Sequence, residues 1–138
     1  MTDVVRTTAR IPPSPAPTSP AQALTARLEE LSRLPAGWDG CGARPVDPLI
    51  AAAARRLVER LPADLLQGAF AVPTAAGGLQ LEWHRGRRVL ELEFESASVL
   101  HTLKWDPSAA EEQEDVIDAG DVDGVVALAR WFHGERPR

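Results

Sequence analysis

Glu82 and His84 are the residues whose types and spacing come closest to acid–base chemistry. They lie two positions apart in a segment of alternating apolar and polar residues, so in a strand both side chains point to one face. A carboxylate beside an imidazole could move protons in a hydrolysis reaction. Asp39, in a glycine-rich loop, would join them in a small hydrolase-type or ligand-binding site only if that loop folded over the same face.

Three further glutamates, Glu91, Glu93 and Glu95, follow at the same two-residue spacing. In a strand they form an acidic ridge on one face. A solvated sheet face is the simplest interpretation, because antiparallel sheets commonly leave one face in water. The functional interpretation is an acidic face that docks a basic partner, or a carboxylate site.

Metal and cofactor chemistry has little support. The three histidines fall on unrelated elements, and Cys41 is the only cysteine. The acidic run 118–124 resembles half of a calcium loop, but with Gly124 at the sixth position the first and twelfth positions are Ala119 and Arg130. Helix capping explains these aspartates better, and the phosphate-binding glycine patterns are absent from the sequence. We therefore predict no catalytic residue, no metal and no cofactor.

The residues that carry these side chains belong to a predicted β-meander over 79–105. Tight turns centred on Arg85-Gly86 and Ser96-Ala97 would give three antiparallel strands with apolar residues on one face. That register also places His101 on the apolar face and Thr102 on the polar one. The expected core set is Leu79, Leu81, Trp83, Leu90, Leu92, Phe94, Val99 and Leu103.

Helices are expected before and after this meander in the sequence. Ser19-Pro20 and Asp47-Pro48 are helix starts, and each helix should end at the next proline. The second carries an apolar stripe that includes Leu49, and a third helix begins around Asp121 or Asp123. Residues 63–68 are a connection and 69–73 a short strand with Phe70 and Val72 inward; the acidic stretch after Pro107 is an exposed loop or frayed turn.

The predicted fold class is therefore α+β: two N-terminal helices, an antiparallel meander of three to four strands and a C-terminal helix, with the helices packed on one face of the sheet. Residues 1–18 are predicted to be a disordered proline-rich tail, 19–134 a single domain and 135–138 a frayed end.

Composition narrows the class of protein. Hydrophobic residues make up 44% and charged residues 25%, as in ordinary globular domains. A net charge of −5 argues against a general nucleic-acid binder. The lone cysteine and the lack of a long apolar run favour a cytoplasmic protein without a membrane segment.

Trp38 lies in the loop Gly37-Trp38-Asp39-Gly40 and either plugs the end of the core or lines a partner surface. This loop, then Gly42-Ala43 and Pro45, Val72-Pro73-Thr74, Gly77-Gly78 and the segment 79–84 resemble a family of small bacterial proteins with no assigned activity. The resemblance covers residues 31–105 and implies a partner or accessory role, such as an antitoxin-like operon component.

The function expected from the sequence is a non-catalytic protein-binding or accessory module with an acidic docking surface. The candidate contacts are Trp38, Asp39, Glu82, His84, Glu91, Glu93 and Glu95. A homodimer through a sheet edge is a further expectation. The alternative is the hydrolase-type or ligand-binding site formed by Asp39, Glu82 and His84.

Overall fold

The computed structural model describes residues 18–134. The predicted proline-rich tail, apart from Thr18, and the predicted frayed end lie outside this range. Five strands form the sheet: β1 (Ala69–Pro73), β2 (Leu79–Arg85), β3 (Arg88–Phe94), β4 (Val99–Asp106) and β5 (Glu111–Asp118). They pair in chain order, and every neighbouring pair is antiparallel.

The two N-terminal helices begin where the serine–proline and aspartate–proline pairs predict. Ser19 Oγ accepts from the backbone N–H of Gln22, and the Gln22 side chain accepts from the Ser19 N–H, which starts α2 (Pro20–Ser32) with a capping box. Asp47 accepts from the Leu49 N–H and caps α3 (Pro48–Arg60). Leu49 itself is 69% exposed, so its predicted place in the apolar stripe is wrong.

The C-terminal helix α4 (Val122–Phe132) begins at Asp121, whose carboxylate accepts from the Gly124 N–H. Asp118 in turn accepts from the Gly120 N–H. The aspartates of this segment therefore cap backbone groups, as predicted in place of a calcium loop. Two short 3₁₀ helices complete the fold, η1 (Ala63–Leu66) and η2 (Pro107–Ala109). The predicted connection 63–68 thus contains a helical turn, which buries Leu65 and Leu66.

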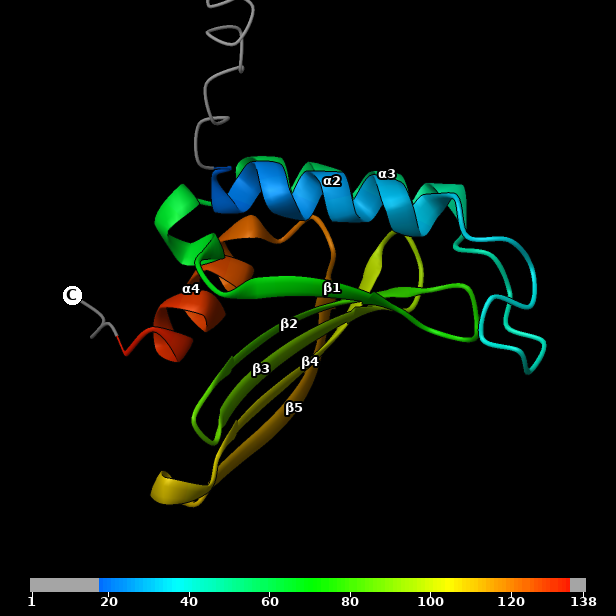
Figure 1. Ribbon diagram of the computed structural model, residues 1–138. Coiled ribbons are helices and arrows are strands. Elements are labelled where there is room, and N and C mark those ends of the chain that lie inside the picture. Colours follow the sequence, from blue (N-terminus) through cyan, green and yellow to red (C-terminus); the bar gives the residue numbers. More distant parts are fainter. Residues whose placement is uncertain (1–17, 135–138) are drawn as a thin grey trace, which may run out of the picture.

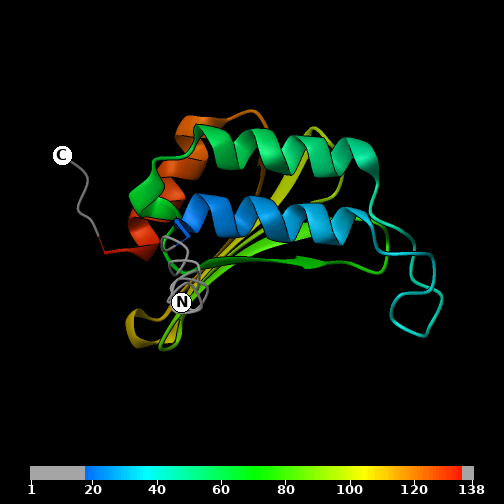
Figure 2. The ribbon, with the colours of Figure 1, turned by 45° about the horizontal axis from the view of Figure 1, so that its top comes forward.

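All three α-helices lie on the same face of the sheet (Figure 1). α2 and α3 run side by side across it, and α4 covers one end (Figure 2). The α+β class and the one-sided helix layer are confirmed. The strand number is corrected from three or four to five, because residues 111–118 form a strand instead of an exposed loop. Among residues 18–134, no helix is both long enough and apolar enough to cross a bilayer.

The first turn of the meander leaves the side chains of β2 and β3 on their predicted faces, but it pairs residues other than those expected. Leu81 pairs with Leu92, and Arg85 pairs with Arg88, so the turn centre is Gly86-Arg87. Gly86 has φ +61°, which suits the first central position of a type II′ hairpin. The shift moves the register by two residues, and two residues restore the same face.

The second turn is one residue longer than predicted, and this reverses β4. The Glu95 N–H donates to the Val99 carbonyl, leaving three residues, 96–98, in the loop. Phe94 therefore pairs with Leu100 and Leu92 with Thr102. A slip of one residue turns every side chain of a strand to the other face. The predicted core positions of Val99 and Leu103, and the inward place of His101, are consequently wrong.

The orientation of β1 is also reversed. Ala71 is buried against the helix layer, whereas Phe70 is 43% exposed on the opposite face. Arg27 of α2 reaches the carbonyl of Ala71 through its Nε, 3.4 Å away. Small residues face α2 because that helix lies directly beside β1, and the expected inward place of Phe70 and Val72 is corrected.

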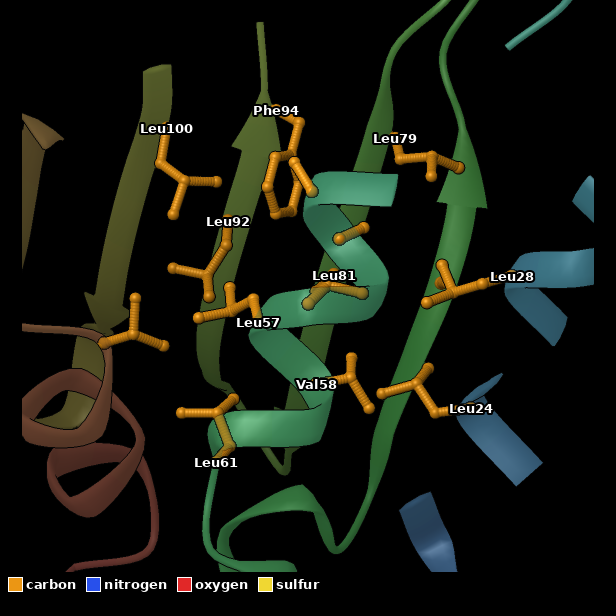
Figure 3. Packing of buried hydrophobic residues seen from close by; sticks show 14 of the residues in the cluster. Leu24, Leu28, Leu57, Val58, Leu61, Leu79, Leu81, Leu92, Phe94 and Leu100 are labelled. Atoms are coloured by element: carbon orange, nitrogen blue, oxygen red, sulfur yellow. The ribbon is translucent and has the colours of Figure 1, made fainter. Parts of the chain in front are cut away.

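The core lies between the sheet and the helices (Figure 3). Leu24 and Leu28 of α2, Leu57 and Val58 of α3, and Leu61 directly after α3 point toward the sheet side chains. Trp83 is fully buried, and its indole N–H donates to the Leu65 carbonyl over 2.9 Å. The strand residues that receive these helix side chains are Leu79, Leu81, Leu90, Leu92, Phe94 and Leu100.

Charged contacts fix α4 to the hairpin end of the sheet. Arg88 holds one carboxylate oxygen of Asp106 through Nε at 3.0 Å and Nη2 at 2.9 Å, and its Nη1 donates to the Trp131 carbonyl. Arg85 donates to the Phe132 carbonyl. The carbonyls of Trp131 and Phe132 lie at the C-terminus of the helix, where positive charge is favourable. The Ser108 hydroxyl, together with Arg88, lowers the pKa of Asp106.

Candidate functional site

The outer face is the side of the sheet that carries no helix. Register places the side chains of Phe70, Glu82, Glu91, Leu103 and Glu114 in one row across the five strands. Neighbouring rows add further acidic and apolar residues. The outward positions of the strands are Phe70, Val72, Gln80, Glu82, His84, Val89, Glu91, Glu93, Val99, His101, Leu103, Trp105, Glu112, Glu114, Val116 and Asp118.

Charge on this face has one sign. Carboxylates occupy β2, β3 and β5, and Glu95 extends the series just beyond β3. Among the outward strand positions of the described chain, lysine and arginine do not occur. Arg85, Arg88 and Lys104 lie at inward positions, where Lys104 bonds Glu111 over 3.4 Å.

Two glutamate–histidine pairs lie on the outer face. His84 Nε2 is 3.0 Å from Glu82 Oε1, and its ring packs on Phe70 with centroids 5.4 Å apart. His101 Nε2 is 2.9 Å from Glu95 Oε2. Both imidazoles are exposed, whereas the Glu82 side chain is only 14% exposed and the Glu95 side chain 63%.

Glu91 lies between these two pairs and has other carboxylates as neighbours. It lies directly opposite Glu82 on β2, and like charges placed opposite each other destabilise a sheet. Burial raises the pKa of Glu91 and the Glu82 carboxylate raises it further; His84 lowers it, and the Glu93 carboxylate raises it again. The face therefore holds negative charge at a cost to the fold.

A shallow hollow of about 570 Å³ lies beside Glu91. Its lining includes Glu91, Glu93, Glu95, His101, Glu114 and Val116. The hollow is open to solvent, and half of the residues that line it are acidic. Within residues 18–134, no cluster of three or more histidine, cysteine, aspartate or glutamate side chains could hold a metal ion.

The Trp38 loop lies elsewhere. The N–H of Arg44 donates to the Ala75 carbonyl, so the loop is attached beside the β1–β2 turn, whereas His84 is near the opposite end of β2. Figure 1 shows the loop extending beyond that turn, away from the β2–β3 hairpin. Asp39 accepts from the N–H groups of Cys41 and Ala43, and these bonds lower its pKa. Asp39 therefore shapes its own loop and does not meet Glu82 and His84.

Trp38 is half-buried and lies outside the hydrophobic core; its indole N–H donates to the Arg44 carbonyl over 3.1 Å. Of the candidate residues, Glu82, His84, Glu91, Glu93 and Glu95 share the outer face, whereas Trp38 and Asp39 do not.

Sequence reasoning missed the apolar residues of the outer face. Phe70 is 43%, Trp105 41% and Val116 61% exposed. The predicted parity of β1 places Phe70 inward, and the predicted parity of β4 that places Val99 and Leu103 inward does the same for Trp105. Val116 has little strand signal around it, since acidic residues precede it without apolar alternation.

Comparison with known proteins gives no relative: no protein-family model, no curated protein and no solved structure matches the chain.

Proposed function

We propose that this protein is a non-catalytic binding module whose outer face docks a basic segment of a partner protein. The observation that carries the proposal is the run of carboxylates across β2, β3 and β5 with no lysine or arginine among the outward strand positions of the described chain. The resemblance of residues 31–105 to a family of small bacterial proteins also implies an accessory role of this kind.

Carboxylates of the outer face repel one another, and His84 relieves this repulsion only in part. Glu82 and Glu91 face each other, and Glu93 lies two residues from Glu91 on the same strand. A guanidinium or ammonium group placed between them would remove the repulsion and form charge-assisted hydrogen bonds. A basic partner therefore gains stability from an arrangement that costs the free protein stability.

Apolar side chains supply the second part of an interface. Phe70, Trp105 and Val116, on three different strands, are exposed among the glutamates and add apolar surface to the outer face. Tryptophan is enriched at the energetic centres of interfaces, and the flat side of an indole also attracts cations. A partner segment with both basic and apolar residues fits this surface.

The alternative function has weaker geometric support. Glu82 and His84 lie within hydrogen-bonding distance, but Asp39 is engaged in its own loop near the other end of β2. The remaining pair lies on an open face, and general acid–base catalysis needs positioned groups around the reacting atoms. The geometry therefore favours binding over hydrolysis.

Capture from a lysate of the source cells tests the proposal. The full chain, the double variant Glu91→Gln/Glu93→Gln and the control Glu29→Gln/Glu59→Gln on the helix side would be tethered to beads. We expect one protein to be retained by the unmodified chain and the control, and retained at least about fivefold less by the outer-face variant, because charge pairs across the interface are lost.

Retention should also weaken between about 0.15 and 0.5 M salt, since screening shortens the range of surface charges. A partner held equally by both double variants, or no specific partner for the unmodified chain, would contradict the proposal.

A further inference from the structure

β5 is the last strand of the sheet, and one of its long edges has no neighbour within residues 18–134. The backbone groups on that edge can be assigned. The Asp115 carbonyl accepts from Thr102 Oγ1 on β4, and the Ala119 N–H donates to the Ser98 carbonyl. Odd-numbered residues of this segment therefore direct their N–H and C=O groups toward β4.

In an antiparallel strand, alternate residues direct their backbone groups to opposite sides. The N–H and C=O groups of Glu112, Glu114 and Val116 consequently point to the open edge. The side chains of the same three residues lie on the outer face. A strand added at this edge would meet both the free backbone groups and the acidic surface.

The other edge of the sheet is less accessible. β1 has five residues against eight in β5, and it ends at Pro73, which has no N–H to donate. Arg27 of α2 occupies the Ala71 carbonyl at that edge. α2 therefore blunts the β1 edge, whereas nothing described covers β5.

We propose that β5 accepts an extended, lysine- or arginine-rich segment of a partner protein as an antiparallel sixth strand. This inference rests on the proposed function and specifies how the basic partner is held. Adding a strand to an exposed edge gives affinity through main-chain hydrogen bonds and selectivity through alternate side chains.

The side chains define the segment. In an antiparallel pair the residues opposite Glu112 and Glu114 share the outer face with them, so cationic residues belong there. A cation opposite Glu112 also approaches Trp105, which pairs with Glu112 from β4. Opposite Val116 an apolar or threonine side chain fits, as does the aliphatic part of a lysine. A second copy of β5 does not, because its own acidic residues would lie against Glu112 and Glu114.

The probe is a short peptide in which lysine alternates with threonine, acetylated and amidated at its ends. With the lysines on the outer face, the lysine N–H groups point to β5 and the threonine N–H groups point away. Methylating the lysine backbone nitrogens should weaken binding to the full chain at least about tenfold, since the main-chain bonds are lost. Methylating the threonine nitrogens preserves charge and composition and should leave the affinity within about twofold.

Hydrogen exchange on the full chain gives the matching readout. On binding the unmethylated peptide, the amides of Glu112, Glu114 and Val116 should exchange at least about tenfold more slowly, because they become hydrogen-bonded. The amides of Gln113 and Asp115 already face β4 and should not change. Val116→Pro should abolish the effect, whereas Val116→Thr should retain it; proline is tolerated where an edge N–H faces solvent.

The two methylated peptides leave the protein unaltered, so the test holds even if Val116→Pro fails to fold. Equal binding of both methylated peptides, with unchanged exchange at the β5 edge, would overturn strand addition and leave outer-face docking intact. No binding of any peptide, together with no charge-dependent partner in the lysate, would overturn both.

Discussion

Glu82 and Glu91 face each other across the β2–β3 pair, with no lysine or arginine at the neighbouring outward strand positions of the described chain. Cross-strand pairs of opposite charge stabilise a sheet, and pairs of like charge destabilise it. A cation that binds beside such a pair removes the repulsion, which makes its binding more favourable. The relationship links the stability of the free protein to its proposed partner.

Glu91→Gln should stabilise the free protein at neutral pH. Because the pKa of Glu91 is raised in the folded protein, the folded state binds this proton more tightly than the unfolded chain does. The free energy of unfolding therefore falls as pH rises from the ordinary glutamate pKa through the raised one. We expect a gain of roughly 0.5 kcal/mol at pH 7 that disappears below about pH 4.

Urea unfolding across this pH range measures the effect. Glu112→Gln is the matched control, since that glutamate lies opposite Trp105 instead of another acid. An equal gain from both substitutions at pH 7 would count against repulsion between Glu82 and Glu91 as the cause.

Arg88→Met should destabilise the fold by about 2 kcal/mol at pH 7, because a buried carboxylate and two helix-terminal carbonyls lose their charged donor. The pKa of Asp106 is lowered in the folded protein, so its stabilising contribution is present above the ordinary aspartate pKa and lost as pH falls through the lowered value. The loss caused by the substitution should therefore shrink in acid.

Arg87→Met provides the comparison, because Arg87 is an exposed residue of the same turn. The free energy of unfolding of this variant, measured by thermal denaturation, should stay within about 0.5 kcal/mol of that of the unmodified protein. A similar loss for both variants would mean that Arg88 does not anchor α4.

The register of β4 can be tested with two leucines. Leu100 is fully buried on the inward face, whereas Leu103 is half-buried on the outer face. Leu100→Ala should cost about 3 kcal/mol of unfolding free energy and Leu103→Ala about 1 kcal/mol, because only the first opens a cavity in the core. The reverse order in chemical denaturation would favour the register expected from a two-residue turn.

Gly78→Ala should destabilise the β1–β2 turn by about 2 kcal/mol, since an added Cβ would lie 2.7 Å from the Phe94 carbonyl oxygen. Backbone atoms of a central strand cannot move aside easily. Gly120→Ala is the control, because its Cβ meets only the end of the Asp118 side chain. Equal thermal shifts for the two variants would exclude the close approach as the cause.

Helix positions could be predicted from the sequence because their signals are local. Ser19-Pro20 and Asp47-Pro48 specify a cap and a first turn within a few residues, and both helices begin there. The inward leucines of β2 and β3 were also predicted correctly, because the error in the first turn was two residues and preserved the parity.

Turn length and edge pairing could not be predicted in the same way. The serines at 96 and 98 are compatible with loops of two or three residues, and one extra residue reverses β4. β5 has almost no strand pattern of its own; its pairing with β4 and the contacts of Glu111 with Lys104 and Trp131 hold it in place. The Glu82–His84 proximity follows from local spacing, whereas the exposed aromatic residues beside it depend on those distant pairings.

The loop around Asp39 has a practical consequence. It carries Cys41, an exposed thiol and the only cysteine of the chain. The loop projects from the β1–β2 end of the molecule, away from the β2–β3 hairpin and η2 (Figure 1). A maleimide dye or sensor chip coupled through this sulfur would give every molecule the same orientation and leave the acidic sheet surface unobstructed.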